Sequence, residues 1–151
     1  MQAVVVANNN TAVGSECLYT NTGGAQNTAV GKAALYANTT GSNNVAVGYN
    51  ALDENTTADD NTGVGYEALH SNTTGYSNTA MGRSALGANT TGFKNTAVGV
   101  NALATNTDGD YNTACGEAAL IASTTANNNT AVGYKSLFAC TTGQFLSLIH
   151  I

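Results

Sequence analysis

The stretch Asn27-Thr28-Ala29-Val30-Gly31 decides the fold, because it returns along the chain at a constant interval. The same five residues, or a one-residue variant of them, begin eight times, each time 17 residues after the last. The starting residues are Asn10, Asn27, Asn44, Asn61, Asn78, Asn95, Asn112 and Asn129. Eight units without insertion or deletion therefore cover residues 10–145, with the consensus N-T-A-V-G-x-x-A-L-x-x-N-T-T-G-x-x. We number the repeat positions 1 to 17 from this Asn.

The repeat positions divide into fixed and variable ones. Asn at position 1, Gly at position 5, Leu at position 9 and Thr at position 13 occur in all eight units. Positions 6, 7, 10, 11, 16 and 17 vary freely and carry every charged residue except Asp108. We therefore expect the fixed small and apolar positions to face neighbouring units and the variable positions to face solvent.

A strict period predicts a stacked architecture, because a 17-residue unit is too short to bury an apolar face alone. Positions 2–4 have the pattern of a short strand, with Thr and Val on one face and Asn and Ala on the other. The prediction is a mainly β fold, a parallel β-solenoid of eight coils, whose ~4.8 Å strand spacing gives a rod about 38 Å long. Stacked Asn side chains are expected to form an amide ladder, and Gly at positions 5 and 15 is expected at corners.

Two features of the coil stay open at this level. Positions 5–12 suit either a second strand or a short helical turn, and the Leu, Ala, Glu and Lys content favours the turn. Val and Leu are expected to fill the interior. Ala at positions 3 and 8 then either leaves a flat apolar stripe for lateral packing or lines a narrow core.

The ends depart from the repeat. Residues 1–9 are expected to form a partial repeat or an N-terminal cap, with Val4-Val5-Val6 in place of Asn-Thr-Thr. Residues 146–151 form a C-terminal tail that is off-register, because Leu146-Ser147-Leu148-Ile149-His150-Ile151 stands where Asn-Thr-Ala-Val-Gly is due. This hexapeptide resembles the translation of a common sequencing-adaptor end, which predicts that it is foreign to the natural protein. Otherwise it serves as an apolar cap or as a strand for a neighbouring chain.

Composition argues against several functions. The chain has 21 Asn and 23 Thr, only 9% charged residues, and a net charge of −5. Four basic residues cannot neutralise a nucleic-acid backbone, so no nucleic-acid partner is expected. No apolar run approaches the ~20 residues of a membrane span, and residues 1–7 lack the features of a secretory signal. No membrane insertion is expected.

Signals of catalysis follow from the repeat itself. Residues 63–68 match the dinucleotide-binding pattern G-x-G-x-x-A only because Gly63 replaces the usual Ala of position 3. Cys17, Cys115 and Cys140 fall at three different repeat positions, and the first two are interpreted as small buried residues. Acidic residues are scattered over several positions, which favours a solvated face over a calcium site. The sequence therefore predicts no enzyme, no cofactor and no metal site.

Two polar arrays are candidate functional residues. Thr at position 13 forms a rank that would bind ice or a glycan, with the candidate ligand face at Thr39, Thr56, Thr73 and Thr90. The alternative, which we favour, is that these hydroxyls satisfy the backbone of a turn. Asn-Thr-Thr at position 12 also forms sequons for N-glycosylation, with the candidate acceptors Asn38, Asn55, Asn72 and Asn89.

The motif Asn-Thr-Ala-Val-Gly-x-x-Ala-Leu resembles repeats of bacterial surface proteins and phage tail-fibre-like proteins. It is more distantly similar to the shorter Ser-Val-Ala-Ile-Gly-like repeats in the heads of trimeric autotransporter adhesins. The likeness covers residues 10–145. It implies an extracellular or cell- or virion-surface location and no catalytic residues. We therefore expect a structural segment of a fibre or adhesin that associates with itself, laterally or end to end. The alternative is an ice- or glycan-binding solenoid, with surface glycans as partners.

Overall fold

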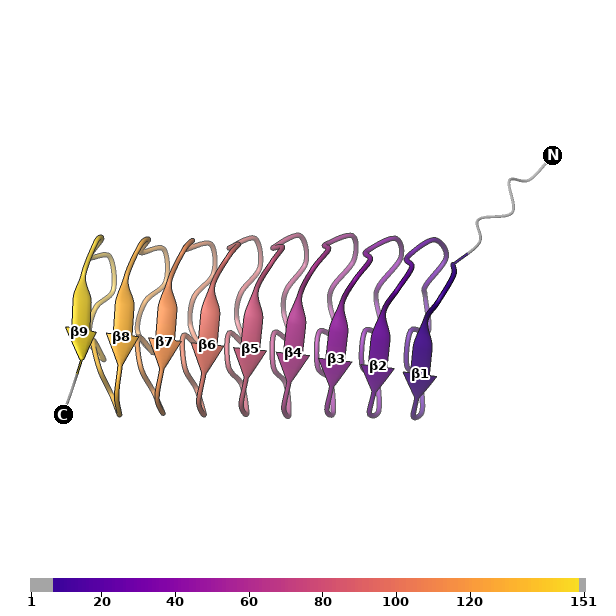
Figure 1. Ribbon diagram of the computed structural model, residues 1–151, viewed down its shortest axis with the longest axis horizontal. Coiled ribbons are helices and arrows are strands. Elements are labelled where there is room, and N and C mark those ends of the chain that lie inside the picture. Colours follow the sequence, from indigo (N-terminus) through magenta and orange to yellow (C-terminus); the bar gives the residue numbers. More distant parts are fainter. Residues whose placement is uncertain (1–6, 150–151) are drawn as a thin grey trace.

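A computed structural model describes residues 7–149 and shows one elongated stack of coils (Figure 1). Each coil contributes one three-residue strand to a single sheet. The strands are β1 (Thr11–Val13), β2 (Thr28–Val30), β3 (Val45–Val47), β4 (Thr62–Val64), β5 (Thr79–Met81), β6 (Thr96–Val98), β7 (Thr113–Cys115), β8 (Thr130–Val132) and β9 (Ser147–Ile149). Most of the expected N-terminal cap lies outside the described residues.

The sheet follows the sequence order from β1 to β9, and every neighbouring pair is parallel. Each residue pairs with the residue 17 positions later, as Thr28 does with Val45 and Ala29 with Ala46. The loops return behind the sheet, so the strands form one side of the rod (Figure 1). The predicted parallel β-solenoid is confirmed.

The short helical turn favoured for positions 5–12 is wrong, because residues 7–149 contain no helix. Positions 7 and 9 of each coil have a positive φ instead, for example +54° at both Glu67 and Leu69. A residue in the left-handed region cannot continue a right-handed helix. Two tight turns replace it, closed by hydrogen bonds from Ala68 N–H to the Gly65 carbonyl (3.4 Å) and from Asn72 N–H to the Leu69 carbonyl (3.2 Å).

The core consists of Ala at positions 3 and 8 and Leu at position 9. Ala80, Ala85 and Leu86, for example, are fully buried within one coil. The expectation that Val fills the interior is wrong, because position 4 lies on the other face of the strand and Val13 is 57% exposed. The Ala residues line a narrow core and leave no surface stripe. So thin a coil has room for methyl groups and one Leu only.

Buried Asn side chains form two ladders along the rod. At position 12, Asn72 Nδ2 donates to Asn55 Oδ1 of the preceding coil (2.9 Å) and to the Gly75 carbonyl of its own coil (2.8 Å). At position 1, Asn61 Nδ2 donates to the same Gly75 carbonyl (2.8 Å), and Asn61 Oδ1 accepts from the N–H of Asn78 (2.9 Å). An amide ladder of the predicted kind runs along position 12, whereas at position 1, where it was expected, the Asn oxygen bonds mainly to the backbone N–H of the next Asn.

The two glycine positions serve different purposes. Position 5 has φ values from +116° to +137°, and a Cβ on Gly65 would lie 2.6 Å from the Gly82 carbonyl oxygen. Position 15 packs tightly against the next coil, but Ala58 and Ala126 occupy it in two units and are buried there. Position 5 therefore requires glycine for its backbone conformation, whereas position 15 favours a small residue.

The sequence predicts that the tail is off-register, but residues 147–149 pair in register with β8. Ser147, Leu148 and Ile149 pair with Thr130, Ala131 and Val132 at the same 17-residue offset as every other strand. Leu146 takes the place of the position-1 Asn, and its N–H donates to Asn129 Oδ1 (2.9 Å). Backbone pairing, which any residue except proline provides, sets the register here without the repeat side chains.

Candidate functional site

A shallow hollow of about 330 Å³ opens on the side of the rod formed by repeat positions 7, 10 and 11. It exists because Gly87 and Ala104 occupy position 10, where other coils carry large side chains such as Tyr36 or Phe138. Its lining residues are Glu67, His70, Ser71, Ser84, Gly87, Ala88 and Ala104. This hollow was not predicted from the sequence. The change from large to small residues at position 10 was the signal.

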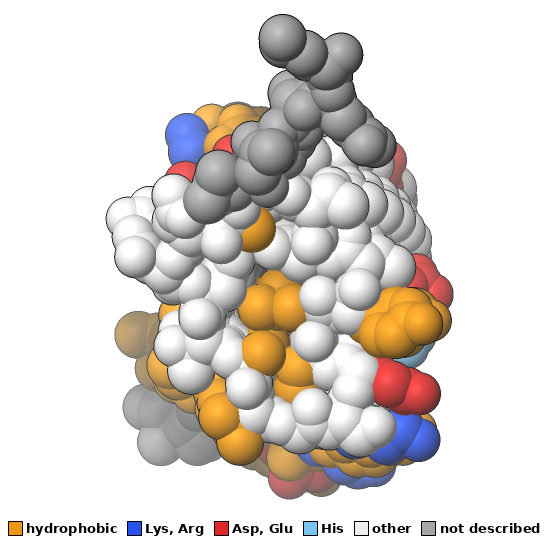
Figure 2. Space-filling model, turned by 90° about the vertical axis from the view of Figure 1, so that its right-hand side faces the viewer, with side chains coloured by type: hydrophobic (Ala, Val, Ile, Leu, Met, Phe, Trp, Pro, Cys, Tyr) orange, Lys and Arg blue, Asp and Glu red, His pale blue; other side chains and the backbone are white. Residues whose placement is uncertain are grey.

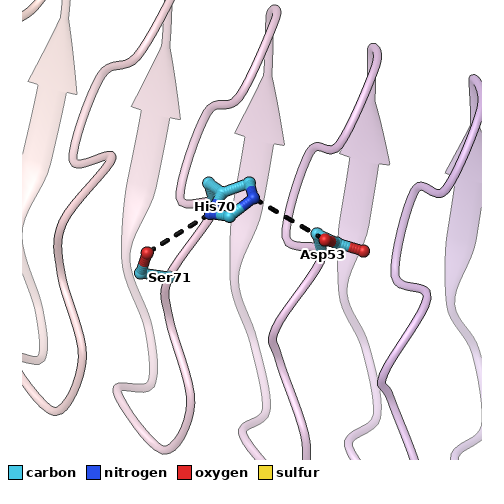
Figure 3. Close-up of polar contacts among 3 residues, drawn as sticks. All are labelled: Asp53, His70 and Ser71. Atoms are coloured by element: carbon cyan, nitrogen blue, oxygen red, sulfur yellow. Dashed lines mark hydrogen bonds and ion pairs between the residues drawn. The ribbon is translucent and has the colours of Figure 1, made fainter.

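Three polar side chains meet at the edge of this hollow (Figure 3). His70 Nε2 lies 3.6 Å from Oδ2 of Asp53, which is the position-10 residue of the preceding coil. His70 Nδ1 lies 3.2 Å from the hydroxyl of Ser71, its neighbour in the chain. The repeat places Asp53 and His70 side by side because residues 17 apart stack directly on one another.

The Asp53 carboxyl is unfavourably placed for a charge. Burial raises its pKa above the ordinary value, and the nearby Glu54 and Glu16 carboxylates raise it further. His70 acts in the opposite direction and lowers the Asp53 pKa, because a protonated imidazole favours the carboxylate. The Asp53 Oδ1 atom is buried and has no hydrogen-bond partner among the described residues. The contact with His70 therefore compensates only part of the burial.

The order Asp53, His70, Ser71 has the residue types of a nucleophilic triad, but its surroundings do not complete one. The backbone N–H groups of Ser71 and of the next residue, Asn72, are both used in the fold: that of Ser71 donates to the Gly87 carbonyl (3.1 Å) and that of Asn72 to the Leu69 carbonyl (3.2 Å). These two adjacent N–H groups are therefore not available as a pair of donors to a developing oxyanion. The residues that the structure describes also contain no group of three or more His, Cys, Asp or Glu side chains suited to a metal. The absence of enzyme activity stays a prediction.

Aromatic side chains stack between neighbouring coils on the outside of the rod. Tyr19 and Tyr36 have ring centroids 5.3 Å apart, and Tyr76 and Phe93 have centroids 4.9 Å apart, both pairs nearly parallel. The view along the rod shows hydrophobic side chains at the centre of the coil and charged ones at its periphery (Figure 2). This arrangement agrees with the expected solvent-facing role of the variable positions.

The candidate ligand face at Thr39, Thr56, Thr73 and Thr90 is half-buried, and its hydroxyls are engaged. Each hydroxyl donates to the backbone carbonyl of the equivalent Thr in the next coil, as Thr56 does to Thr73 (3.1 Å) and Thr73 to Thr90 (3.0 Å). These residues therefore satisfy backbone groups between coils, as the alternative interpretation held, although the bond runs to the next coil rather than within the turn.

The four candidate glycosylation sites, Asn38, Asn55, Asn72 and Asn89, belong to the position-12 ladder and are fully buried. Each amide nitrogen, the atom to which a glycan attaches, donates two hydrogen bonds, as Asn89 Nδ2 does to Asn72 Oδ1 (2.8 Å) and to the Gly92 carbonyl (2.9 Å). A folded coil has no room for a sugar on these atoms. Glycosylation therefore has no place in the function proposed below.

The cysteines occupy three different environments. Cys17 is half-buried, and its thiol donates to the Gly31 carbonyl (2.7 Å). Cys140 is half-buried at repeat position 12 of the eighth coil, beyond the end of the Asn ladder. Cys115 is exposed, so its interpretation as a buried residue is wrong, because position 4 points outward. All three are free thiols.

No protein-family model matches the chain, and neither a curated protein nor a solved structure shows significant similarity to it. The likeness to surface and tail-fibre repeats therefore rests on the motif alone and stays a prediction. The described part of the chain contains no helix long and apolar enough to cross a membrane. The fold and the repeat define the class of protein: a parallel β-solenoid repeat protein.

Proposed function

We propose that the chain is a structural segment of an extracellular fibre or adhesin, acting as a stiff rod that associates with further copies end to end. The observation that carries this proposal is the regularity of the bonds between coils. The backbone N–H groups of Thr28, Thr62 and Thr113 each donate to the backbone carbonyl of the position-1 Asn in the next coil. These acceptors are Asn44, Asn78 and Asn129, and each bond is 2.8 Å long.

These bonds lie along the axis of the rod, and they recur from the first coil to the last. The position-1 Asn ladder adds side-chain bonds in the same direction along the whole rod, and the position-12 ladder adds further ones from Asn21 to Asn106. A pull along the axis is therefore shared among several bonds per coil. Such a structure suits a spacer that holds one end of a fibre away from the other.

We expect the proposed end-to-end association to use the outer edge of β9, because any strand paired in this register presents the same outward backbone groups, whatever its side chains. The N–H of Thr130 donates to the Leu146 carbonyl of the next coil (2.8 Å), so the equivalent N–H of Ser147 points away from β8. Among the described residues nothing pairs with this outer edge. An unpaired strand edge is a template for another strand, here the first coil of a second copy. The lateral route through an Ala stripe has no basis, because those residues are buried.

Sedimentation velocity over a range of protein concentrations tests the proposal. The wild-type chain should form larger species as concentration rises. Ser147→Pro should remain monomeric, because proline removes the outward N–H without removing a bond to β8. Ser147→Ala keeps this N–H and should behave like the wild type. A wild type that stays monomeric throughout, or equal association of both variants, would contradict end-to-end assembly.

A further inference from the structure

The outward-facing side of the sheet, which we call the outer face, consists of the side chains at repeat positions 2 and 4. Position 2 forms a rank of hydroxyls and position 4 a rank of apolar groups. The hydroxyl rank comprises Thr11, Thr28, Thr62, Thr79, Thr96, Thr113, Thr130 and Ser147, with Val45 as the exception. The apolar rank comprises Val13, Val30, Val47, Val64, Met81, Val98, Cys115, Val132 and Ile149. No function proposed so far uses this face.

The hydroxyls of the outer face differ from those of position 13. The position-13 hydroxyls donate to backbone carbonyls, as that of Thr73 does. No Thr or Ser hydroxyl of the outer face makes a hydrogen bond to another described residue. Thr96 and Thr113 are exposed, and so are Val98 and Met81, at 37% and 45%. The face therefore offers water a row of free hydroxyls beside a row of methyl groups.

The outer face is also regular in two directions. Successive strands pair without any change of register, and the backbone fixes each strand to the next on both sides. The hydroxyls therefore repeat at the strand spacing of ~4.8 Å along the rod, and each lies about 6.6 Å from the apolar group two residues further on. In Figure 1 the nine strands run nearly parallel, with little twist between neighbours.

The chemistry of the face restricts what it can bind. It carries no charged and no aromatic side chain, so it has nothing to pair with an ionic partner or to stack on a sugar ring. Its area, about 38 Å by 10 Å, is roughly half of the ~800 Å² that each partner contributes to a standard protein interface. A second copy of this chain is therefore a poor occupant.

We propose that the outer face binds ice. Ice is an uncharged, periodic array of water molecules, and a rigid, uncharged surface with free hydroxyls at a constant spacing can hold water in such an array. Because backbone pairing fixes the strands and the β-branched Thr and Val side chains have few χ1 rotamers, little conformational entropy is lost on binding. The side chains of the apolar rank make no hydrogen bonds to water, so only the hydroxyls fix the positions of the bound water molecules.

An ice-recrystallisation assay on the full chain tests this proposal, together with thermal hysteresis. The wild type should keep ice grains small. Thr79→Lys places a long charged side chain at the middle of the outer face, and activity should fall about tenfold, a change of about 1.4 kcal/mol. Thr74→Lys makes the same change at an exposed position-14 corner and should leave activity unaltered. Circular dichroism confirms that both variants are folded.

A second variant separates hydroxyls from shape. Thr62→Val, Thr79→Val and Thr96→Val together remove three hydroxyls from neighbouring strands, and Val45 shows that the fold accepts valine at this position. Loss of activity in this folded triple variant supports the role of the hydroxyls. A folded wild type without effect on ice grains, or equal losses in Thr79→Lys and Thr74→Lys, would overturn the proposal. Neither result bears on the sedimentation test of the fibre.

Discussion

Asn side chains are normally a poor choice for a protein interior, yet here they are among the most buried residues. Asn72 is acceptable because its Nδ2 donates two hydrogen bonds, and its Oδ1 accepts one from Asn89. The ladder stops at Asn106, because position 12 of the next coil holds Ser123. Asn106 Oδ1 and Ser123 Oγ are buried and have no partner among the described residues. This is the weakest place in the ladder.

Ser123→Asn should repair this break and stabilise the protein by about 1 kcal/mol, the net value of a typical hydrogen bond. The new Nδ2 reaches both Asn106 Oδ1 and the Ala126 carbonyl in the arrangement of the other coils. Urea unfolding monitored by circular dichroism measures the change. Ser71→Asn, at half-buried position 11, is the control and should have little effect. No gain from Ser123→Asn would contradict the role assigned to the ladder.

The two glycine positions should respond differently to the same substitution. Gly65→Ala forces a side chain into φ +136° and should cost about 3 kcal/mol of unfolding free energy. A Cβ on Gly75 would lie 2.3 Å from the Gly92 carbonyl oxygen, but the φ is ordinary and Ala58 shows that a coil can shift to accept alanine here. Gly75→Ala should therefore cost only about 1 kcal/mol. Thermal and urea unfolding of the pair give the comparison. Equal costs would mean that crowding, not backbone conformation, requires the position-5 glycine.

The raised pKa of Asp53 makes a prediction about pH. A carboxyl with a raised folded-state pKa contributes stability below its ordinary pKa of 3.8, and this contribution is lost as pH rises through the folded-state value. Asp53→Asn should therefore be more stable than the wild type at pH 7, and the two should converge at pH 3. Because His70 favours the carboxylate, the difference at pH 7 should be larger in a His70→Gln background. Urea unfolding at both pH values checks this.

At the scale of the coil, sequence reasoning succeeded where each repeat position had one physical requirement. The 17-residue period gave the strands and their register, and invariant Asn and Gly gave the ladders and a corner. It failed for Val and Ala, because alternation along a strand defines two faces without saying which one is buried. Valine is more apolar than alanine, yet Val64 at position 4 lies on the outer face of the sheet. Ala80 at position 3 fills the core, because a coil this thin has room only for the smaller side chain.

The tight turns at positions 5–12 were also not predicted, because they require a left-handed conformation at Leu69. Non-glycine residues avoid positive φ at a cost of about 1–2 kcal/mol, so sequence patterns do not predict a left-handed Leu. Burial of the Leu side chain contributes about 1.5–3 kcal/mol and outweighs this cost. The hollow beside His70 was missed because it depends on small residues in two neighbouring coils at once.

The coil should behave as a removable unit. Deletion of residues 78–94, one whole repeat, should leave a folded rod shorter by ~4.8 Å, because the strands on either side have the same pairing register. Deletion of residues 78–85, about half a repeat, should abolish cooperative unfolding, because it places core residues of one coil against surface residues of the next. Circular dichroism melts and small-angle X-ray scattering distinguish the two. Similar behaviour of both deletions would contradict a register-based core.

At the scale of the whole molecule, the rod has no centre. Each coil contacts only the coils before and after it, so stability is a sum of nearly equal steps and length is adjustable by adding repeats. Variable positions then change the surface without changing the frame, as the Tyr19–Tyr36 stack and the Asp53–His70 pair show at the same repeat position 10. A rod whose fixed positions build the coil and whose variable positions form the surface suits a structural segment that presents different surfaces along its length.

Electron cryomicroscopy of the purified chain is the decisive test of end-to-end stacking. If coils stack between copies as they do within one, the protein forms filaments whose axial step of ~4.8 Å continues across the junctions between chains. Ser147→Pro should give short, separate rods of nine stacked strands, about 38 Å long, under the same conditions. Separate rods from the wild type at every concentration would contradict the end-to-end fibre, and particles without the axial step would contradict the stacked coil itself.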